Sequence, residues 1–277
     1  MCRRVERYDA SMKPDLRLGE LAEPRTGSPL RLESGSLVST QSGCEFPIHA
    51  DWIDFLPEHD REGPQVMTAL MHLPAVSAAY EQVLRPSVDR IRGGQRVDWR
   101  REISWATEEL KEHRGVVADI ACGSGRVGIA AARDTAFESL YCIDRSEPLL
   151  AQCVRRSEMS PLRCPVAILR ADARRLPLAD GSLDAAHIRL GASLWRAIES
   201  LVVELARVVK PGGEVLASSV SGRADLRGLA AQMIMARTAG ISMPSPTRVR
   251  SLCENSGFYR INVERGAGMM RLRMLRS

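Results

Sequence analysis

Three aspartates and two glycines stand where predicted strands end, and their types and spacing suit the binding of a nucleoside. A buried apolar run contains Asp119 and leads into Gly123 and Gly125. Asp144 ends a second run about 20 residues later, and Asp172 follows a third. Glycine lets the backbone turn tightly and approach a ligand, while a carboxylate can accept hydrogen bonds from both ribose hydroxyls. We therefore predict a nucleoside site at one edge of a sheet.

These residues can meet only if a sheet positions them, and the pattern of apolar runs in the sequence predicts such a sheet. Short apolar runs, each a predicted strand, occur at 116–121, 140–143, 166–169, 183–188 and 215–220. Amphipathic helical stretches follow four of them, beginning near Gly125, Ser146, Ser193 and Asp225. This alternation is typical of βαβ units and predicts an α/β fold with a parallel sheet covered on both faces.

Five motifs in order resemble those of the class I S-adenosylmethionine-dependent methyltransferases, over about residues 64–277. The first, Asp119-Ile-Ala-Cys-Gly-Ser-Gly125, looks like the family's glycine loop, and Ile143-Asp-Arg-Ser146 looks like its ribose-binding turn. The stretch 171–184 is similar to the family's D-A-x-x-L-P-F-x-D-x-S-F-D segment. The stretches 204–213 and 252–258 resemble the turn before the fifth strand and the late L-x-x-x-G-F element. The resemblance is to members of the methyltransferase-11/UbiE-like group.

The resemblance implies a Rossmann-like fold with a mostly parallel, seven-stranded sheet whose last strand is antiparallel, plus a small N-terminal β unit. It implies S-adenosyl-L-methionine as cofactor and S-adenosyl-L-homocysteine as product. Asp144 and Arg145 would flank the ribose and adenine, and Asp172 would accept a hydrogen bond from the adenine amino group. The full set of implied cofactor-binding residues is Asp119, Ala121, Gly123, Gly125, Asp144, Arg145, Asp172, Ala173 and Arg189.

The N-terminal part is expected to form three further units. Residues 1–20 read as a flexible arm, 21–62 as a small β unit, and 63–114 as a helical cap on the acceptor side of the domain at 115–277. The β unit resembles a zinc ribbon, as found in members such as rRNA guanine methyltransferases, but every ligand cysteine is replaced: the four positions hold Glu23, Thr26, Ser39 and Ser42. These side chains cannot supply the soft ligands of structural zinc, so we expect no metal.

Packing is then expected to hold this degenerate ribbon together, through Phe46, Pro47, Ile48, Trp52, Ile53 and Phe55. A small β unit without a metal is marginally stable alone, so it should lean on the catalytic domain. A role in shaping the acceptor site, a role in dimerisation and a mere structural remnant all remain open.

Residues that contact the acceptor are expected in the helical cap and after the fourth strand. The stretch Tyr80-Glu-Gln-Val-Leu-Arg85-Pro86 matches a Y-E-x-x-x-R-P segment of ribbon-bearing relatives, although packing and a surface ion pair explain it equally well. Trp195 stands where relatives have a histidine, which removes the obvious general base. His187 lies within a predicted strand and fits a buried, hydrogen-bonded histidine better than a base. The acceptor-side candidates are His72, Tyr80, Arg85 and Trp195, and the catalytic candidates are Tyr80, His187 and Trp195.

Methyl transfer to a small molecule, within specialised metabolite or natural product biosynthesis, is the function that these features favour. Two alternatives stay open: an rRNA base methyltransferase, and a protein that binds the cofactor without transferring a methyl group, as a cyclase or scaffold. The acceptor atom, O, N, C or S, is not specified by the sequence.

The composition of the chain limits the classes of partner and the cellular locations that we expect. There are 39 basic and 34 acidic side chains, which mix along the chain, and only 4% of residues are aromatic, so a nucleic-acid partner is disfavoured. The seven cysteines are odd in number and contain no C-x-x-C pair, which is typical of reduced intracellular thiols. We expect a cytoplasmic protein without a membrane anchor, and the sequence leaves a homodimer open.

Overall fold

The computed structural model describes residues 17–49, 51–56, 98–190, 194, 197–220, 245–266 and 269–277. Its strands are β1 (Leu30–Glu33), β2 (Ser36–Ser39), β3 (Glu45–Pro47), β4 (Ile53–Asp54), β5 (Val116–Ile120), β6 (Ser139–Asp144), β7 (Val166–Arg170), β8 (Leu183–Arg189), β9 (Val209–Val220), β10 (Phe258–Gly266) and β11 (Met269–Arg276). Its helices are η2 (Leu18–Glu20), α4 (Trp99–Lys111), α5 (Gly128–Asp134), α6 (Glu147–Glu158), α8 (Ile198–Val208) and α10 (Pro246–Asn255). None of the described helices is both long and apolar enough to cross a membrane.

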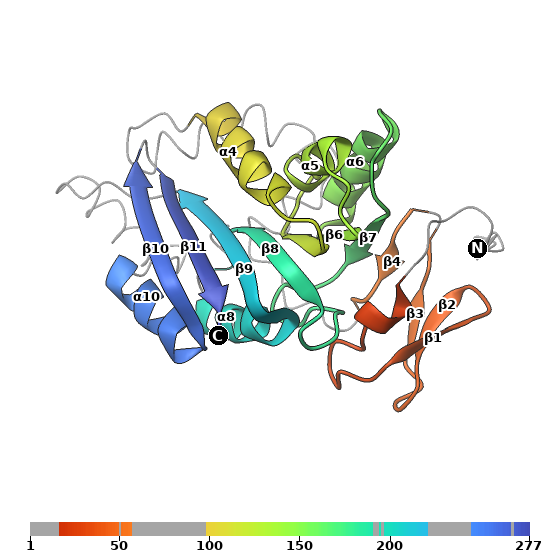
Figure 1. Ribbon diagram of the computed structural model, residues 1–277. Helices are drawn as coiled ribbons and strands as arrows, with labels where there is room; N and C mark the ends of the chain where they lie inside the picture. The colour runs from red at the N-terminus through yellow and green to blue at the C-terminus, as the bar shows by residue number, and fades with distance from the viewer. Residues whose placement is uncertain are drawn as a thin grey trace, which may run out of the picture.

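The main sheet has eight strands in the order β10-β11-β9-β8-β5-β6-β7-β4 (Figure 1). The strands from β4 to β9 pair in parallel, and the last strand, β11, runs antiparallel to both β9 and β10. The parallel sheet and its antiparallel last strand were expected. The eighth strand was not: β4 belongs to the N-terminal unit and extends the sheet at the β7 edge.

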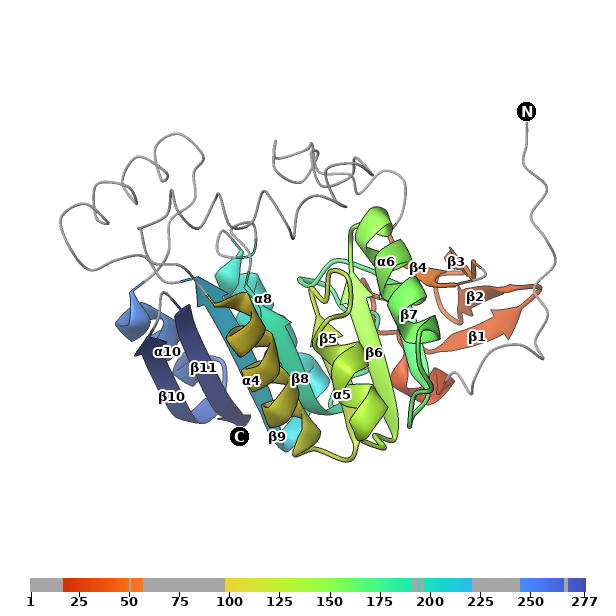
Figure 2. The same ribbon diagram turned by 90° about the horizontal axis from the view of Figure 1, so that it is seen from above.

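Helices cover both faces of this sheet (Figure 2). Alternate residues of β5 point to opposite sides, so that Val117 joins a core with α4, α5 and α6, whereas Val116 and Ala118 join a core with α8 and α10. Because both faces are covered, all five residues of β5 are buried. The central strands are therefore apolar, as is typical of parallel sheets.

The N-terminal unit packs onto the main sheet rather than standing apart. Strands β1, β2 and β3 form a small antiparallel sheet. Its apolar side chains, such as Leu37 and Phe46, belong to the same buried cluster as Leu169 and Leu178 of the main domain. Of the side chains expected to hold the unit by packing, Phe46, Ile48, Ile53 and Phe55 are buried, Trp52 is half-buried and Pro47 is exposed.

Most of the expected arm, residues 1–20, lies outside the described residues, but its last part is ordered against the domain. Residues 18–20 form η2, and Arg17 forms ion pairs with Glu20 and Glu138 at 3.2 and 2.9 Å. The expected arm is thus too long at its C-terminal end. The expected helical cap is described only from Asp98 onward, where α4 begins with Asp98 accepting hydrogen bonds from the backbone N–H groups of Arg100 and Arg101.

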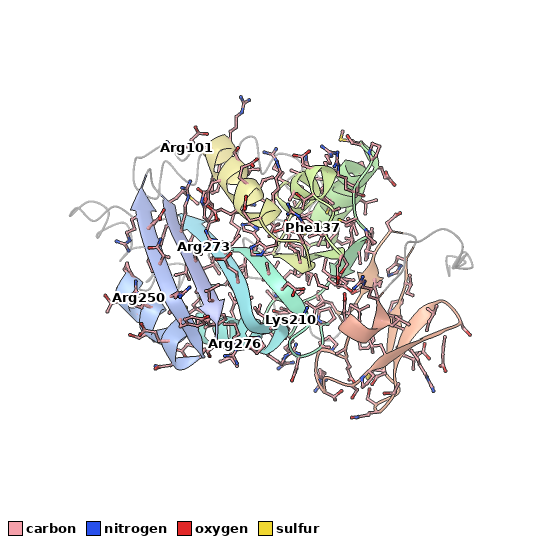
Figure 3. All side chains as sticks on the ribbon, viewed as in Figure 1. Arg101, Phe137, Lys210, Arg250, Arg273 and Arg276 are labelled. Carbon is pink, nitrogen blue, oxygen red and sulfur yellow. The ribbon has the colours of Figure 1, made fainter. Side chains whose placement is uncertain are left out.

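The C-terminal hairpin β10–β11 is tied to the helices behind it. The Arg276 guanidinium, near the end of β11, donates hydrogen bonds to the backbone oxygens of Ala206 in α8 and Gly257 in the turn after α10, at 2.8 and 2.9 Å (Figure 3). Arg273, further up the same strand, pairs with Glu109 of α4 at 2.8 Å (Figure 3). The hairpin is therefore anchored on both faces of the sheet.

Candidate functional site

The loop between β5 and α5 has a backbone that approaches a ligand easily. Ala121, Gly123 and Gly125 all adopt positive φ, of 53°, 56° and 71°. A Cβ on Gly123 would meet no atom closer than 3.9 Å, so the side of the loop at this residue is open. A Cβ on Gly125 would instead stand 2.4 Å from the Sγ of Cys153, so this glycine is required by packing of the loop onto α6.

Asp144, the last residue of β6, links this loop to the turn between β6 and α6. Its Oδ2 accepts a hydrogen bond from the backbone N–H of Gly123 at 2.9 Å, and its Oδ1 accepts one from the backbone N–H of Ser146 at 2.8 Å. Burial raises the pKa of this carboxyl, although the two backbone hydrogen bonds partly oppose that effect. Each oxygen retains capacity for a further donor, as two ribose hydroxyls would supply.

Asp119 supports the loop from beneath. Its carboxylate accepts the backbone N–H of Gly128, at the start of α5, at 2.9 Å, and it meets His187 Nδ1 of β8 at 2.8 Å. Both residues are only 1% exposed. Asp119 was predicted to contact the cofactor. His187, although named as a catalytic candidate, was expected to be a buried, hydrogen-bonded histidine, and the structure does bury the two side chains against each other. Their interactions position the loop.

Asp172 lies at the carboxyl end of β7 and is held by arginines. Arg174 donates to it from its backbone N–H at 2.9 Å and from its guanidinium at 2.6 Å, and Arg145 lies 3.7 Å away. Burial would raise the pKa of Asp172, but the hydrogen bonds and charges of Arg174 and Arg145 outweigh that effect and lower it. Asp172 is therefore ionised, with arginine donors already in place where an adenine amino group was expected.

Three thiols that the sequence analysis did not assign lie under the glycine loop. Cys122, Cys142 and Cys153 are buried and interact with one another, and burial raises the pKa of Cys122 well above its ordinary value. Cys122 directly precedes Gly123, and its thiol lies 3.6 Å from the Gly123 carbonyl oxygen. The cysteines come from β6, α6 and the loop, so only the folded chain reveals the cluster.

The remaining predicted residues are spread over different parts of the molecule. Arg189, at the end of β8, lies over the ring of Trp99, with 5.5 Å between the guanidinium carbon and the ring centroid. Ala173 is buried beside Asp172. The acceptor-side candidates His72, Tyr80, Arg85 and Trp195 lie outside the described residues. The structure thus brings together the predicted cofactor residues at the ends of β5, β6 and β7.

Known proteins share this domain. Residues 117–213 match the model of a family described as a methyltransferase domain. An uncharacterized chloroplastic methyltransferase of Arabidopsis thaliana is 33% identical over 156 residues, which cover 55% of this chain and 43% of that protein. A demethylmenaquinone methyltransferase of Desulfitobacterium hafniense is 31% identical over 120 residues, covering 43% of this chain and 46% of that protein. The matches thus span less than half of either relative.

Solved structures show the same fold. Phosphoethanolamine N-methyltransferase 2 of Haemonchus contortus, in complex with phosphomonomethylethanolamine and S-adenosylhomocysteine, superposes with a TM-score of 0.55 at 19% identity, covering 72% of this chain and 44% of that one. Human N-acetylserotonin methyltransferase in complex with its cofactor superposes with a TM-score of 0.54 at 15% identity, covering 80% and 60%. Residues 117–213 therefore match a methyltransferase domain, and the chain shares the fold of these solved methyltransferases.

Proposed function

We propose that this protein transfers the methyl group of S-adenosylmethionine to a small-molecule acceptor. One observation carries the proposal: the Asp144 carboxylate at the end of β6 joins the backbone N–H of Gly123 at 2.9 Å, where the loop has positive φ and open space. A carboxylate beside a glycine loop at the ends of neighbouring parallel strands is the arrangement that nucleoside ligands use.

The described residues fit this cofactor. Asp144 has acceptor capacity left for two ribose hydroxyls, and Gly123 presents no side chain on the open side of the loop. We assign the adenine side to Asp172 and Ala173, with Arg174 adjusting to make room for the adenine amino group. When bound, the cofactor supplies an electrophilic methyl group on its sulfonium. The protein must then mainly hold the acceptor atom in line with that methyl group.

A small-molecule acceptor is supported by the names of the relatives, which include demethylmenaquinone and 2-phytyl-1,4-naphtoquinone methyltransferases. We keep His72, Tyr80, Arg85 and Trp195 as acceptor-side candidates. We assign His187 a positioning role, because its ring is buried against Asp119. Chemistry at the acceptor then depends on residues other than His187.

Calorimetric titration with S-adenosylmethionine and S-adenosylhomocysteine tests cofactor binding. We expect binding by the wild type, loss of binding in Gly123→Arg, and an affinity about 10- to 100-fold lower in Asp144→Ala, because hydrogen bonds to a charged group are removed. Asp180→Ala is the matched control, since the Asp180 side chain is 79% exposed. A wild type that binds neither ligand would overturn the proposal.

Transfer from methyl-labelled cofactor tests the acceptor class. The protein is incubated in parallel with a small-metabolite extract and with total RNA, and Asp144→Ala serves as the inactive control. Label in a small organic product is the expected result. Label in RNA would establish the rRNA alternative, and cofactor binding with no labelled product in either fraction would favour the cyclase or scaffold alternative.

We also propose a cytoplasmic location, supported by the cysteines. All six cysteines in the described part of the chain are free thiols. Since two of the relatives are chloroplastic by name, the test is fractionation of the source cell with an antibody to the protein. Recovery in an organelle or an exported fraction would contradict the proposal. Light scattering of the purified protein separately tests the homodimer.

A further inference from the structure

Two tight turns in the N-terminal unit bring four polar side chains to one point. The first turn is closed by a hydrogen bond from the Gly27 N–H to the Glu23 carbonyl at 2.9 Å, and the second by one from the Gly43 N–H to the Ser39 carbonyl at 3.1 Å. Both glycines have φ of 71°. The two turns thus have the same form and face each other.

A single carboxylate oxygen lies where the side chains meet. Glu23 Oε2 accepts hydrogen bonds from the hydroxyls of Thr26, Ser39 and Ser42, at 2.7, 2.7 and 2.9 Å. Glu23 is only 3% exposed, and Ser39 only 2%. We call Glu23, Thr26, Ser39 and Ser42 the carboxylate centre.

Burial would raise the pKa of the Glu23 carboxyl, but the hydrogen bonds of the three hydroxyls outweigh that effect and lower it, which favours the ionised form. A hydroxyl has one proton, and each of the three hydroxyls donates its proton to Glu23. Their oxygens in turn accept: Thr26 Oγ1 from the backbone N–H of Ser28 at 3.2 Å, Ser39 Oγ from that of Ser42 at 3.3 Å, and Ser42 Oγ from that of Cys44 at 3.1 Å. Every donor is used, and only an anionic oxygen suits three of them at once.

The centre directly follows the residues that contact the main domain. Immediately before Glu23, Leu21 forms a bridge with Leu178, and the Ala22 N–H donates to the Pro177 carbonyl at 3.2 Å. Glu20 accepts a hydrogen bond from the Tyr141 hydroxyl at 2.7 Å. The chain therefore passes directly from the docking contacts into the carboxylate centre.

Zinc does not fit these residues. A tetrahedral zinc site needs thiolate, imidazole or carboxylate ligands, and three of the four side chains are neutral hydroxyls whose protons are used. Among the residues that the structure describes, no group of three or more His, Cys, Asp or Glu could hold a metal ion. We infer that the Glu23 carboxylate takes the place of a metal ion, on two turns that still present four side chains in the arrangement of metal ligands.

Rebuilding the ligands tests this inference. The variant E23C/T26C/S39C/S42C should bind one equivalent of Zn²⁺ and, with Co²⁺, show the absorption of a tetrahedral thiolate site. Its melting temperature should fall when the metal is removed by a chelator. A folded variant that binds no metal would overturn the inference, since the side chains would then not converge as ligands do.

The control variant places cysteines on the same turns but facing outward. Arg25, Thr40 and Gln41 are exposed, so R25C/T40C/Q41C should bind no stoichiometric Zn²⁺. Equal metal uptake by the two variants would also overturn the inference. The wild type should contain no zinc by elemental analysis and should keep its melting temperature in the presence of a chelator. One equivalent of tightly bound zinc in the wild type would contradict it directly.

A second measurement does not require the cysteine variant to fold. Limited proteolysis within residues 17–56 should be about tenfold faster in Glu23→Ala than in the wild type, because three hydroxyls, among them that of the buried Ser39, lose their acceptor. Glu23→Gln should fall between the two, and Glu45→Ala, which changes an exposed carboxylate of β3, should match the wild type. An unchanged rate in Glu23→Ala would overturn the inference. Cofactor titration of each variant keeps this result separate from the proposed function.

Discussion

Two glycines of the loop, only two positions apart, have different physical reasons to be glycine. Gly123 faces open space, and the neighbouring Ala121 shows that a residue with a Cβ can adopt positive φ in this loop. Gly125 lies against Cys153 and Ile129, which a Cβ would approach to 2.4 and 2.9 Å. We therefore expect Gly123 to serve ligand approach and Gly125 to serve packing.

Alanine at each position should separate these roles. Gly123→Ala should lower the free energy of unfolding by about 1–2 kcal/mol, from backbone strain alone, while weakening cofactor binding. Gly125→Ala should lower it by about 2–5 kcal/mol, because overpacking adds to the strain. Urea unfolding and calorimetric titration measure the two effects.

A double variant tests whether the contact with Cys153 causes the loss of stability in Gly125→Ala. Cys153→Ala removes the Sγ that the new methyl group would meet, so G125A/C153A should recover part of the stability lost in Gly125→Ala. The contact explanation is wrong if the two changes are additive. The interaction energy from the four unfolding curves decides this.

The charge of Asp144 should make cofactor binding depend on pH. Burial raises the pKa of this carboxyl, and the ionised form is the one that can accept from both ribose hydroxyls. Affinity should therefore be full near neutral pH and fall on acidification before an ordinary aspartate, with its pKa of about 4, would protonate. Titrations from about pH 8 to about pH 5 test this, and Asp144→Asn, which cannot ionise, should bind weakly with a flat profile.

The spacing of residues in the sequence predicted the site residues that lie at the ends of strands. It did not predict pairs of residues that only the folded chain brings together. Gly123 and Asp144 follow predicted strands, so their meeting at one sheet edge was foreseeable. The pair Asp119 and His187 joins residues 68 positions apart, and no local pattern reports it. Glu23 was judged only as a missing zinc ligand, because hydrogen bonds among four side chains on two turns leave no periodic signal.

At the scale of elements, α4 is held on the sheet by a buried ion pair. Glu102 of α4 is 3% exposed and accepts two hydrogen bonds from the Arg271 guanidinium of β11, at 3.1 and 2.9 Å. The same guanidinium lies over the ring of Trp105, 4.5 Å from its centroid. Loss of the arginine would therefore leave a buried carboxylate without its charge partner.

Arg271→Ala should lower the free energy of unfolding by about 3–5 kcal/mol, the usual result of breaking a buried ion pair. Arg271→Lys should recover only part of this, because an ammonium cannot form the same two hydrogen bonds and stack on Trp105. Arg248→Ala is the control: it breaks an exposed pair with Glu199 and should change stability by less than about 1 kcal/mol. Equal losses in the two alanine variants would show that α4 is held by other contacts.

Element positions followed from the sequence wherever the apolar runs were long. Strands β5 to β8 lie within one or two residues of the predicted runs, because their residues are buried or half-buried on both faces. The two-residue strand β4 gave no signal, so the eighth strand of the sheet was missed. Strand β9 begins at Val209 rather than 215, because Val209 pairs with Leu183 of β8 before the Pro-Gly-Gly stretch. The register between the two strands shifts across that stretch and resumes where Glu214 pairs with Ala185.

For the whole molecule, the N-terminal unit and the main domain share one core. Leu21, Leu37 and Phe55 are buried in the same cluster as Leu169 and Leu178. Strand β4 covers the β7 edge, with Ile53 opposite Leu169. A sheet edge and an apolar face covered in this way would be exposed if the unit were absent.

This arrangement predicts that the two parts fold together. The full chain should unfold in one cooperative transition, and a chain that starts at residue 57 should aggregate, because the β7 edge and the apolar face around Leu178 become exposed. Tyr141→Phe, which removes the hydrogen bond to Glu20 and keeps the ring, should lower the free energy of unfolding by about 1 kcal/mol without splitting the transition. Calorimetry and size-exclusion chromatography measure these outcomes. A truncated chain that stays monomeric and binds S-adenosylmethionine as the full chain does would show instead that the N-terminal unit is an independent attachment.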